Sequence, residues 1–298
     1  MKIQRTILLA ALALAACSGN QEQKVMVRAV PERADDFVWE NNLMCWRAYG
    51  EGLEDPTYPG HVISSGFDLW VKYPGRLVAD SLYYNELNGG RSYHTNYGLG
   101  KDCYKVAHTV GAGSSVLIID GEGRYPSTNY RSFEILEQTP VEACFVLHYP
   151  EWEAAGRTIS LDRKITVCAD SYFCKAEDTY TFSGEGPLKV LAGIRSADYM
   201  KKAPKEGWPA LEGAGIYATW TAATDQSVEP EQSRIGIAVL VPGSDALPEP
   251  ADGGVIKGIA QEINSGEPFC YRFGACWSEG NIKSSEEFFE LVKNFSAK

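Results

Sequence analysis

Aromatic, acidic and basic side chains are concentrated in the first third of this 298-residue chain. Aromatic faces stack on sugar rings, while carboxylates and guanidinium groups hydrogen-bond hydroxyls and the carboxylates of uronic acids. The combination is typical of a carbohydrate cleft. The candidate substrate-binding residues lie in three segments, 32–50, 65–72 and 92–106, and are Arg33, Trp39, Glu40, Arg47, Asp68, Trp70, Lys72, Asp102 and Tyr104.

Tyr93 and His94 are the candidate catalytic pair. A lyase acting on a uronic acid needs a base that removes the C5 proton, an acid for the leaving oxygen, and a cation that neutralises the carboxylate. We expect His94 with Tyr93 to transfer the protons, and Arg47 or Arg33 to neutralise the carboxylate. The carboxylates expected to orient sugar hydroxyls are Glu40, Asp68 and Asp102.

Two other interpretations of these residues stay open. In a non-catalytic carbohydrate-binding protein, a stacking platform would be formed by Trp39, Trp46, Trp70 and Tyr93. In a mutarotase-like sugar isomerase, His94 would work with a carboxylate. For any single residue, an ordinary place in a strand is the simpler explanation, because alternate side chains of a strand face the core and the solvent.

Composition narrows the classes of partner and cofactor. The formal net charge is −11 and no basic stripe occurs, so nucleic acid is excluded as a partner. An acidic oligosaccharide is compatible with this charge only where Arg and Lys gather in one cleft. No Cys-x-x-Cys occurs and the four His are scattered, so we expect neither a metal site nor a cofactor.

The N-terminus has the pattern of a bacterial lipoprotein signal. Lys2 and Arg5 precede an apolar run over 7–16, which ends in small residues before Cys17. We expect residues 1–16 to be a signal peptide, Cys17 to carry the lipid, and residues 17–31 to be a flexible tether. Ser18 stands where an Asp would retain a lipoprotein in the inner membrane. The expected location is therefore the outer membrane, on its periplasmic or cell-surface side, with the lipid as the only membrane contact.

The middle of the chain, which must hold these segments in place, is predicted to consist of strands. Apolar or alternating runs bounded by Gly, Pro or Asp occur at 116–119, 143–149, 159–167, 173–182, 190–194, 216–221 and 235–241. At the C-terminus, Ser284 and Glu287 form a capping box before a helix with one apolar face. We expect residues 32–298 to form a single β-sandwich domain that is all-β, mainly antiparallel, with one C-terminal helix.

Cysteine pairing stays open at this point. Cys17 is assigned to lipid, which leaves an odd number of thiols, so at least one is unpaired. The pairs Cys168/Cys174 and Cys270/Cys276 have a spacing that would bridge the arms of a hairpin. Buried free thiols are the alternative, because Cys is among the most buried residue types.

The chain resembles the Bacteroidota lipoprotein family described as domain of unknown function 4861. The matching blocks are Glu32-Arg33-x-Asp35-Asp36-Phe37-x-Trp39-Glu40-Asn41, Arg47-x-Tyr49-Gly50, Ser65-Gly66-x-Asp68-x-Trp70-x-Lys72, Tyr93-His94 and Gly100-x-Asp102-x-Tyr104-Lys105-Val106. The resemblance implies a β-supersandwich similar to the galactose-mutarotase-like fold. It also implies a role in polysaccharide degradation beside enzymes that handle uronic acids, which favours a lyase or hydrolase over a binding protein.

One stretch departs from the family pattern. After Tyr93-His94 the family has an Asp-His-Gly-Glu-Gly stretch, whereas this chain has Asn96-Tyr97-Gly98-Leu99-Gly100. Neither Asn96 nor Leu99 can transfer a proton. If that stretch is catalytic in relatives, this chain is a binding paralogue or has changed its activity.

Overall fold

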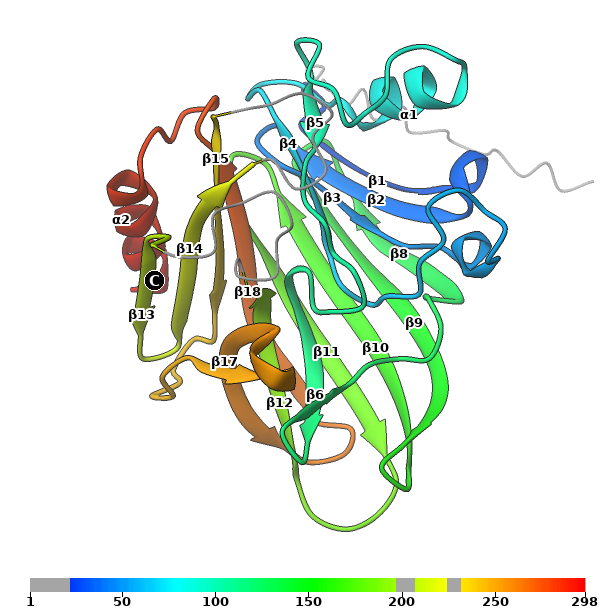
Figure 1. Ribbon diagram of the computed structural model, residues 1–298, viewed down its shortest axis with the longest axis vertical. Coiled ribbons are helices and arrows are strands. Elements are labelled where there is room, and N and C mark those ends of the chain that lie inside the picture. The colour runs from blue at the N-terminus through cyan, green and yellow to red at the C-terminus, as the bar shows by residue number, and fades with distance from the viewer. Residues whose placement is uncertain (1–21, 197–206, 224–231, 298) are drawn as a thin grey trace, which may run out of the picture.

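The structure is a computed structural model that describes residues 22–196, 207–223 and 232–297. Three sheets of antiparallel strand pairs form most of it (Figure 1). The first sheet contains, in spatial order, β1 (Val25–Val30), β2 (Asp36–Asn41), β3 (Cys45–Ala48), β4 (Asp68–Lys72) and β5 (Gly100–Asp102). The second five-stranded sheet contains β16 (Glu249–Ala251), β17 (Ile256–Ile263), β12 (Leu188–Arg195), β6 (Ala112–Ile119) and β7 (Glu122–Arg124).

The third sheet is the largest and has eight strands. Its order is β13 (Ala210–Gly213), β14 (Ile216–Ala222), β15 (Arg234–Leu240), β18 (Pro268–Trp277), β11 (Phe173–Phe182), β10 (Arg157–Cys168), β9 (Glu142–Ala154) and β8 (Ser132–Gln138). The remaining elements are the helices α1 (Ala79–Leu87) and α2 (Ser285–Ser296) and the short 3₁₀ turns η1 (Pro31–Arg33), η2 (Glu51–Glu54) and η4 (Asp252–Gly254).

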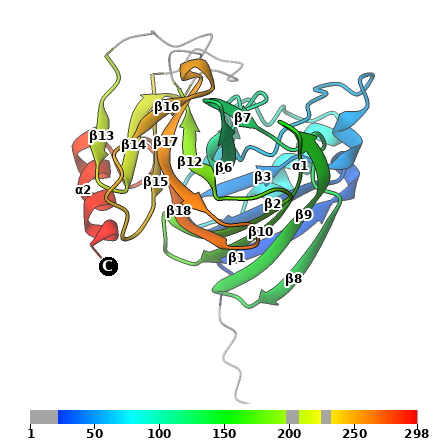
Figure 2. The ribbon, with the colours of Figure 1, turned by 90° about the horizontal axis from the view of Figure 1, so that it is seen from below.

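Both smaller sheets pack against one face of the eight-stranded sheet and share a hydrophobic core with it (Figure 2). Phe273 of β18 is central to this contact. Its ring centroid lies 4.9 Å from that of Trp46 and 4.6 Å from that of Phe67. The predicted strands coincide with β6, β9, β10, β11, β12, β14 and β15. The prediction of stacked antiparallel sheets with one C-terminal helix is confirmed.

The C-terminal helix α2 has the predicted cap. Ser284 is the N-cap, and its hydroxyl accepts a hydrogen bond from the Glu287 backbone N–H. Phe288 and Val292 are fully buried against β14 and β15. A second helix, α1, was not predicted; it covers the outer face of the first sheet (Figure 1).

Successive side chains of β2 point to opposite faces of the first sheet, so its apolar and its charged residues are on different sides. Phe37 and Trp39 point toward the eight-stranded sheet, where they contact Phe145. Asp36 and Glu40 have the opposite parity, so they lie on the outer face, beneath α1. The charged side chains of this sheet are therefore collected on one side, away from the shared core.

Strand β1 corrects the predicted start of the domain. It occupies positions 25–30, assigned above to the tether, and pairs with β2 along its whole length. Val25 and Val30 are fully buried, so the boundary predicted at residue 32 is too late. Cys17 and residues 1–16 lie outside the described residues. In the part of the chain that the structure describes, no helix is long and apolar enough to cross a membrane.

The cysteines other than Cys17 are free thiols in the structure. They are Cys45, Cys103, Cys144, Cys168, Cys174, Cys270 and Cys276. Of the two interpretations left open by the sequence, the structure agrees with free thiols.

Candidate functional site

The site is built on the outer face of the first sheet, and strand register brings its charges together. Arg47 of β3 lies opposite Asp68 of β4. On the next strand pair, Trp70 of β4 lies opposite Asp102 of β5. Asp68 is directly opposite Arg47 on the neighbouring strand, and the long Arg47 side chain also reaches across β4 to Asp102 of β5.

Arg47 is the centre of a buried charge cluster. Its Nε donates to Asp68 Oδ2 at 2.8 Å and its Nη2 to Asp102 Oδ2 at 3.0 Å. Nη1 lies 3.6 Å from Asp36 Oδ2. Burial by itself lowers the pKa of Arg47, but Asp68 and the neighbouring anionic groups outweigh it and hold the pKa well above its usual value. Arg47 is therefore a permanent cation with only 2% of its surface exposed.

Three aromatic rings surround the Arg47 guanidinium. Its Cζ atom lies 4.9 Å from the ring centroid of Trp70, 5.3 Å from that of Tyr49 and 5.4 Å from that of Tyr93. At these distances cation–π attraction adds to the ion pairs. The rings also restrict where the guanidinium can move, so its position is fixed by packing as well as by charge.

A second arginine holds Tyr93 in place. Arg33 pairs with Asp36, with Nη1 and Oδ2 3.0 Å apart, and its Nη2 donates to the Tyr93 hydroxyl at 3.2 Å. Tyr83 of α1 also donates to Asp36, at 3.2 Å. Burial raises the pKa of Asp36, against the opposing influence of Arg47 and Arg33. The Tyr93 hydroxyl thus lies beside a cation.

His94 and Asp102 form the other side of the site. His94 Nδ1 lies 3.1 Å from the Asp102 backbone oxygen and 3.7 Å from Oδ2 of the same residue. A carbonyl oxygen only accepts hydrogen bonds, so this contact places the proton of a neutral ring on Nδ1 and leaves Nε2 able to act as a base. Burial, with a further contribution from the negative charge of Asp68, raises the pKa of Asp102 to about 7.

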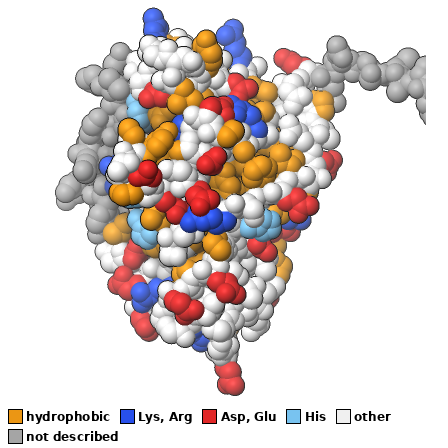
Figure 3. All heavy atoms as spheres, turned by 90° about the vertical axis from the view of Figure 1, so that its right-hand side faces the viewer, with side chains coloured by type: hydrophobic (Ala, Val, Ile, Leu, Met, Phe, Trp, Pro, Cys, Tyr) orange, Lys and Arg blue, Asp and Glu red, His pale blue; other side chains and the backbone are white. Residues whose placement is uncertain are grey.

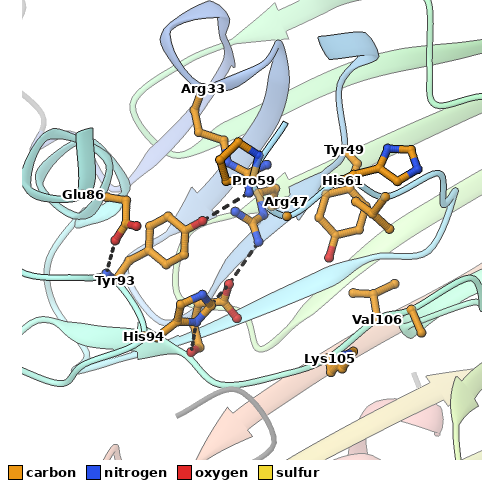
Figure 4. Close-up of a pocket in the computed structure, with 14 residues that line it drawn as sticks. Arg33, Arg47, Tyr49, Pro59, His61, Glu86, Tyr93, His94, Lys105 and Val106 are labelled. Atoms are coloured by element: carbon orange, nitrogen blue, oxygen red, sulfur yellow. Dashed lines mark hydrogen bonds and ion pairs between the residues drawn. The ribbon is translucent and has the colours of Figure 1, made fainter. Parts of the chain in front are cut away.

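These residues line one cavity of about 440 Å³ (Figure 4). Two buried polar atoms of the lining residues have no hydrogen-bond partner within the described parts of the chain: Arg47 Nη1, a donor, and Asp102 Oδ1. Leaving such atoms unpaired costs about 1–3 kcal/mol each. A ligand that offers a carboxylate or a hydroxyl to this part of the cavity would recover that free energy.

The structure brings together five of the predicted site residues. The predicted residues that line the cavity are Arg33, Arg47, Tyr93, His94 and Asp102. Asp68 and Trp70 are fully buried behind them, where they contact Arg47 and position it.

Four predicted substrate-binding residues have structural roles instead. Trp39 has the opposite parity to the charged residues of β2 and is buried in the shared core. Glu40 accepts from the N–H groups of Val78 and Ala79 and pairs with Lys72 Nζ at 2.7 Å, so both charges belong to the start of α1. The Tyr104 hydroxyl is buried and donates to the Gly111 backbone oxygen.

The predicted stacking platform of Trp39, Trp46, Trp70 and Tyr93 is wrong, because its tryptophans are buried. The exposed fraction of each side chain decides the point: Trp39 0%, Trp46 1% and Trp70 0%. None of these rings can receive a sugar from solvent. Tyr93 lines the cavity but is itself held by Arg33.

Several lining residues were not predicted, among them Tyr49, His61, Glu86 and Lys105. Tyr49 had a usable signal, because it follows Arg47 by two positions and so shares its face. His61 and Lys105 come from loops, and Glu86 comes from the unpredicted helix, so no periodic pattern pointed to them. Figure 4 shows these side chains around the same hollow as Arg47.

The stretch that departs from the family pattern lies beside the cavity. Asn96 donates to the Tyr73 hydroxyl at 3.0 Å, and Leu99 packs against the apolar cluster beneath α1. Neither residue lines the cavity. In the described residues, no three His, Cys, Asp or Glu side chains are grouped so that they could hold a metal ion.

Residues 14–298 match the family profile "Domain of unknown function (DUF4861)". The chain belongs to this family. Uncharacterized protein P7 of Formosa agariphila is 32% identical to it over 153 residues, which are 50% of this chain and 38% of that protein. The DUF4861 chain therefore matches well under half of the length of this relative.

Two solved structures align with most of the DUF4861 chain. One is the GH36 α-galactosidase AgaB from Geobacillus stearothermophilus, with a TM-score of 0.38 and 13% identity over 85% of this chain and 41% of that one. The other is AgaA A355E D548N from the same organism, in complex with raffinose, with a TM-score of 0.35 and 11% identity over 82% of this chain and 40% of that one. Both scores are low, so the family assignment rests on the sequence profile.

Proposed function

We propose that this protein is a lipid-anchored lipoprotein outside the cytoplasm that cleaves uronic-acid-containing oligosaccharides by β-elimination. The observation that carries the proposal is the grouping, around one cavity, of Arg47, whose Nη1 makes no hydrogen bond within the described residues, with the proton-transfer candidates Tyr93 and His94. The cavity volume of about 440 Å³ is in the range of small-ligand sites. Lys105 and Arg33 add two further cations to its lining.

The roles follow from the contacts. A uronate carboxylate bound against Arg47 Nη1 would delocalise the charge that forms when the C5 proton leaves. His94 Nε2 would take that proton. The C4–O4 bond then breaks as the C4–C5 double bond forms, and the Tyr93 hydroxyl, hydrogen-bonded by Arg33, would protonate the departing oxygen. After product release, His94 gives the proton it gained to solvent, and Tyr93 regains a proton from solvent, which restores both groups.

A lyase fits the lining better than a hydrolase does. Glycosidases use two carboxyl groups on opposite sides of the glycosidic bond. Of the described lining residues, only Glu86 and Asp102 carry carboxyl groups. Glu86 Oε2 already accepts the Tyr93 backbone N–H at 2.9 Å, so Asp102 is the one buried carboxyl group with an unpaired oxygen.

A panel of saturated and unsaturated uronic-acid oligosaccharides tests the proposal. Product analysis by mass spectrometry and ultraviolet absorbance is run alongside binding calorimetry. We expect a new C4–C5 double bond in the product from at least one saturated oligosaccharide. Binding without any product would show a carbohydrate-binding protein, and hydrolysis without a double bond would show a hydrolase; either result contradicts the lyase.

A further inference from the structure

A second cavity, also of about 440 Å³, lies at the open edge of the sandwich between β1 and β8. Its lining is formed by Ala29, Asp35, Glu51, Tyr130, Arg131, Ser132 and Phe133. None of these residues takes part in the charge cluster around Arg47. The β8 edge belongs to the side of the molecule turned to the viewer in Figure 3, where hydrophobic side chains gather among charged ones.

Phe133 is suited to stack on a sugar ring. It is 42% exposed, although it stands on a strand next to the shared core. Its ring centroid lies 5.0 Å from that of Phe37, which is fully buried. One side of the Phe133 ring is therefore held by packing while another faces the cavity, and such a fixed aromatic surface loses little conformational entropy when a ring stacks on it.

The charged residues that line this cavity are mainly acidic, whereas those that line the first cavity are mainly basic. Arg131 is neutralised by Glu54, with Nη1 and Oε1 2.6 Å apart. Asp35 and Glu51 are exposed carboxylates, and Glu51 lies 3.7 Å from the Arg131 Nε. Carboxylates hydrogen-bond sugar hydroxyls well but repel a uronate. The lining therefore favours an uncharged sugar.

The two cavities lie close together along the chain. Arg33 lines the first and Asp35 the second, and likewise Tyr49 lines the first and Glu51 the second. Two residues span at most about 7 Å, so Arg33–Asp35 and Tyr49–Glu51 form a short stretch of backbone, here called the ridge, that borders both cavities. At this ridge a Cβ on Gly50 would lie 2.0 Å from the Asp35 carbonyl oxygen, and Asp35 itself has a φ of +61°.

We propose that the second cavity is a subsite for a neutral sugar unit, stacked on Phe133 and hydrogen-bonded by Asp35 and Glu51. Combined with the proposed function, on which this step rests, it defines the substrate as a mixed oligosaccharide. One uronic acid occupies the cavity with Arg47, and a neutral unit of the same chain lies across the ridge.

Neutral oligosaccharides carry no carboxylate for Arg47, so their binding tests the subsite independently of the first cavity. The Phe133→Trp variant keeps an aromatic surface and adds a fluorescent reporter, and wild type supplies the background. Xylotetraose, cellotetraose, mannotetraose and galactotetraose are titrated to millimolar concentrations. We expect at least one to change the fluorescence of the variant beyond that of wild type. Phe133→Ala should weaken the binding of that sugar about tenfold, measured by calorimetry.

The matched control is Leu136→Ala, on the same strand. Leu136 is 48% exposed but does not line the cavity, so we expect its replacement to leave binding unchanged. No response of Phe133→Trp to any neutral sugar, or equal losses in the Phe133→Ala and Leu136→Ala variants, would overturn the subsite.

A mixed probe separates this proposal from the proposed function. Glucuronic acid linked to xylotriose is compared with xylotetraose on wild type and Phe133→Ala. If both proposals hold, the acidic probe binds more tightly and Phe133→Ala weakens both probes. If only the subsite holds, the two probes bind equally. If only the acidic cavity holds, the Phe133→Ala substitution affects neither probe.

Discussion

At the scale of single residues, Arg47 is the group on which the site depends. It is a permanent cation in contact with three aspartates, and its Nη1, 3.6 Å from Asp36 Oδ2, makes no hydrogen bond within the described residues. Nε and Nη2 already donate to the carboxylates of Asp68 and Asp102, so the guanidinium is held in one orientation when a ligand carboxylate binds. This arrangement favours recognition of one anionic group at one position rather than of anions in general.

Replacing His94 tests the proposed base. His94 has a side chain that is 27% exposed and makes one hydrogen bond to the backbone, so His94→Gln should leave the melting temperature nearly unchanged. We expect turnover of the cleaved oligosaccharide to fall by a factor of about 100 or more. His148→Gln, at a partly exposed histidine on β9, is the control. Unchanged turnover in His94→Gln, or loss of its fold, would remove His94 from the proposed role.

Asp102 gives the protein a specific pH dependence. Its pKa in the folded protein is about 7, above the usual 3.8, so the folded state binds more protons than the unfolded state between these values. The stability that Asp102 contributes is therefore present at low pH and is lost as pH rises toward 7. Asp102→Asn should remove this loss, so the stability of the variant relative to wild type should rise from pH 4 to pH 7.

Denaturant unfolding at several pH values measures this difference. The exposed Asp245→Asn serves as the control and should follow wild type at every pH. A constant offset between Asp102→Asn and wild type would contradict the raised pKa.

The cavity residues assigned from the sequence lie both inside and outside strands: Arg47 and Asp102 are in β3 and β5, whereas Arg33 is in η1 and Tyr93 and His94 lie outside the strands. Arg47, Asp68 and Asp102 were predicted because dense polar and aromatic segments mark the site. The error at Trp39 was avoidable, since it has the opposite parity to Asp36 and Glu40 within one strand. His61 and Lys105 were not predictable, because only the three-dimensional course of two loops brings them to the cavity.

At the scale of elements, the start of α1 is held on the first sheet by Glu40, a carboxylate that also forms a buried ion pair with Lys72. Glu40 accepts the N–H groups of Val78 and Ala79, and Lys72 donates to both Glu40 and the Asn41 backbone oxygen. The helix then supplies Tyr83 to Asp36 and Glu86 to Tyr93, so Glu40 supports one wall of the cavity from outside it.

Breaking this pair should be costly. In Glu40→Gln the fully buried Lys72 loses its counter-charge, and we expect the free energy of unfolding to fall by about 3 kcal/mol. The double variant Glu40→Gln/Lys72→Met buries no unpaired charge and should recover most of that loss. Urea denaturation measures both. A double variant that is no more stable than Glu40→Gln would contradict the explanation.

Strands of the two later sheets were predicted and α1 was not, for a physical reason. The strands show alternating or continuous apolar runs between turn residues, which are local patterns. Helix α1 has Val78 as its N-cap and no side-chain cap of its own, because Glu40, 38 positions earlier, performs that role. A start signal that is supplied from a distant strand cannot be read locally. Helix α2, with Ser284 as a local cap, was predicted.

At the scale of the whole molecule, the proposed anchor and the cavity set where the protein meets its substrate. We expect Cys17→Ser to release the protein into the soluble periplasmic fraction, because loss of the acyl chains removes the only predicted membrane contact. Fractionation and immunoblotting of cells that express each form measure this. Retention of the variant in the membrane fraction would contradict the lipid anchor.

The central claim is that the cavity around Arg47 recognises the carboxylate of a uronic acid. The most direct test is calorimetric titration with uronic-acid oligosaccharides and with the same oligosaccharides after chemical reduction of their carboxyl groups to alcohols. The account predicts measurable binding of the acidic forms and at least a tenfold weaker affinity for the reduced forms, because a charged hydrogen bond to Arg47 contributes about 1.5–3 kcal/mol. Equal affinity for the two forms would contradict it.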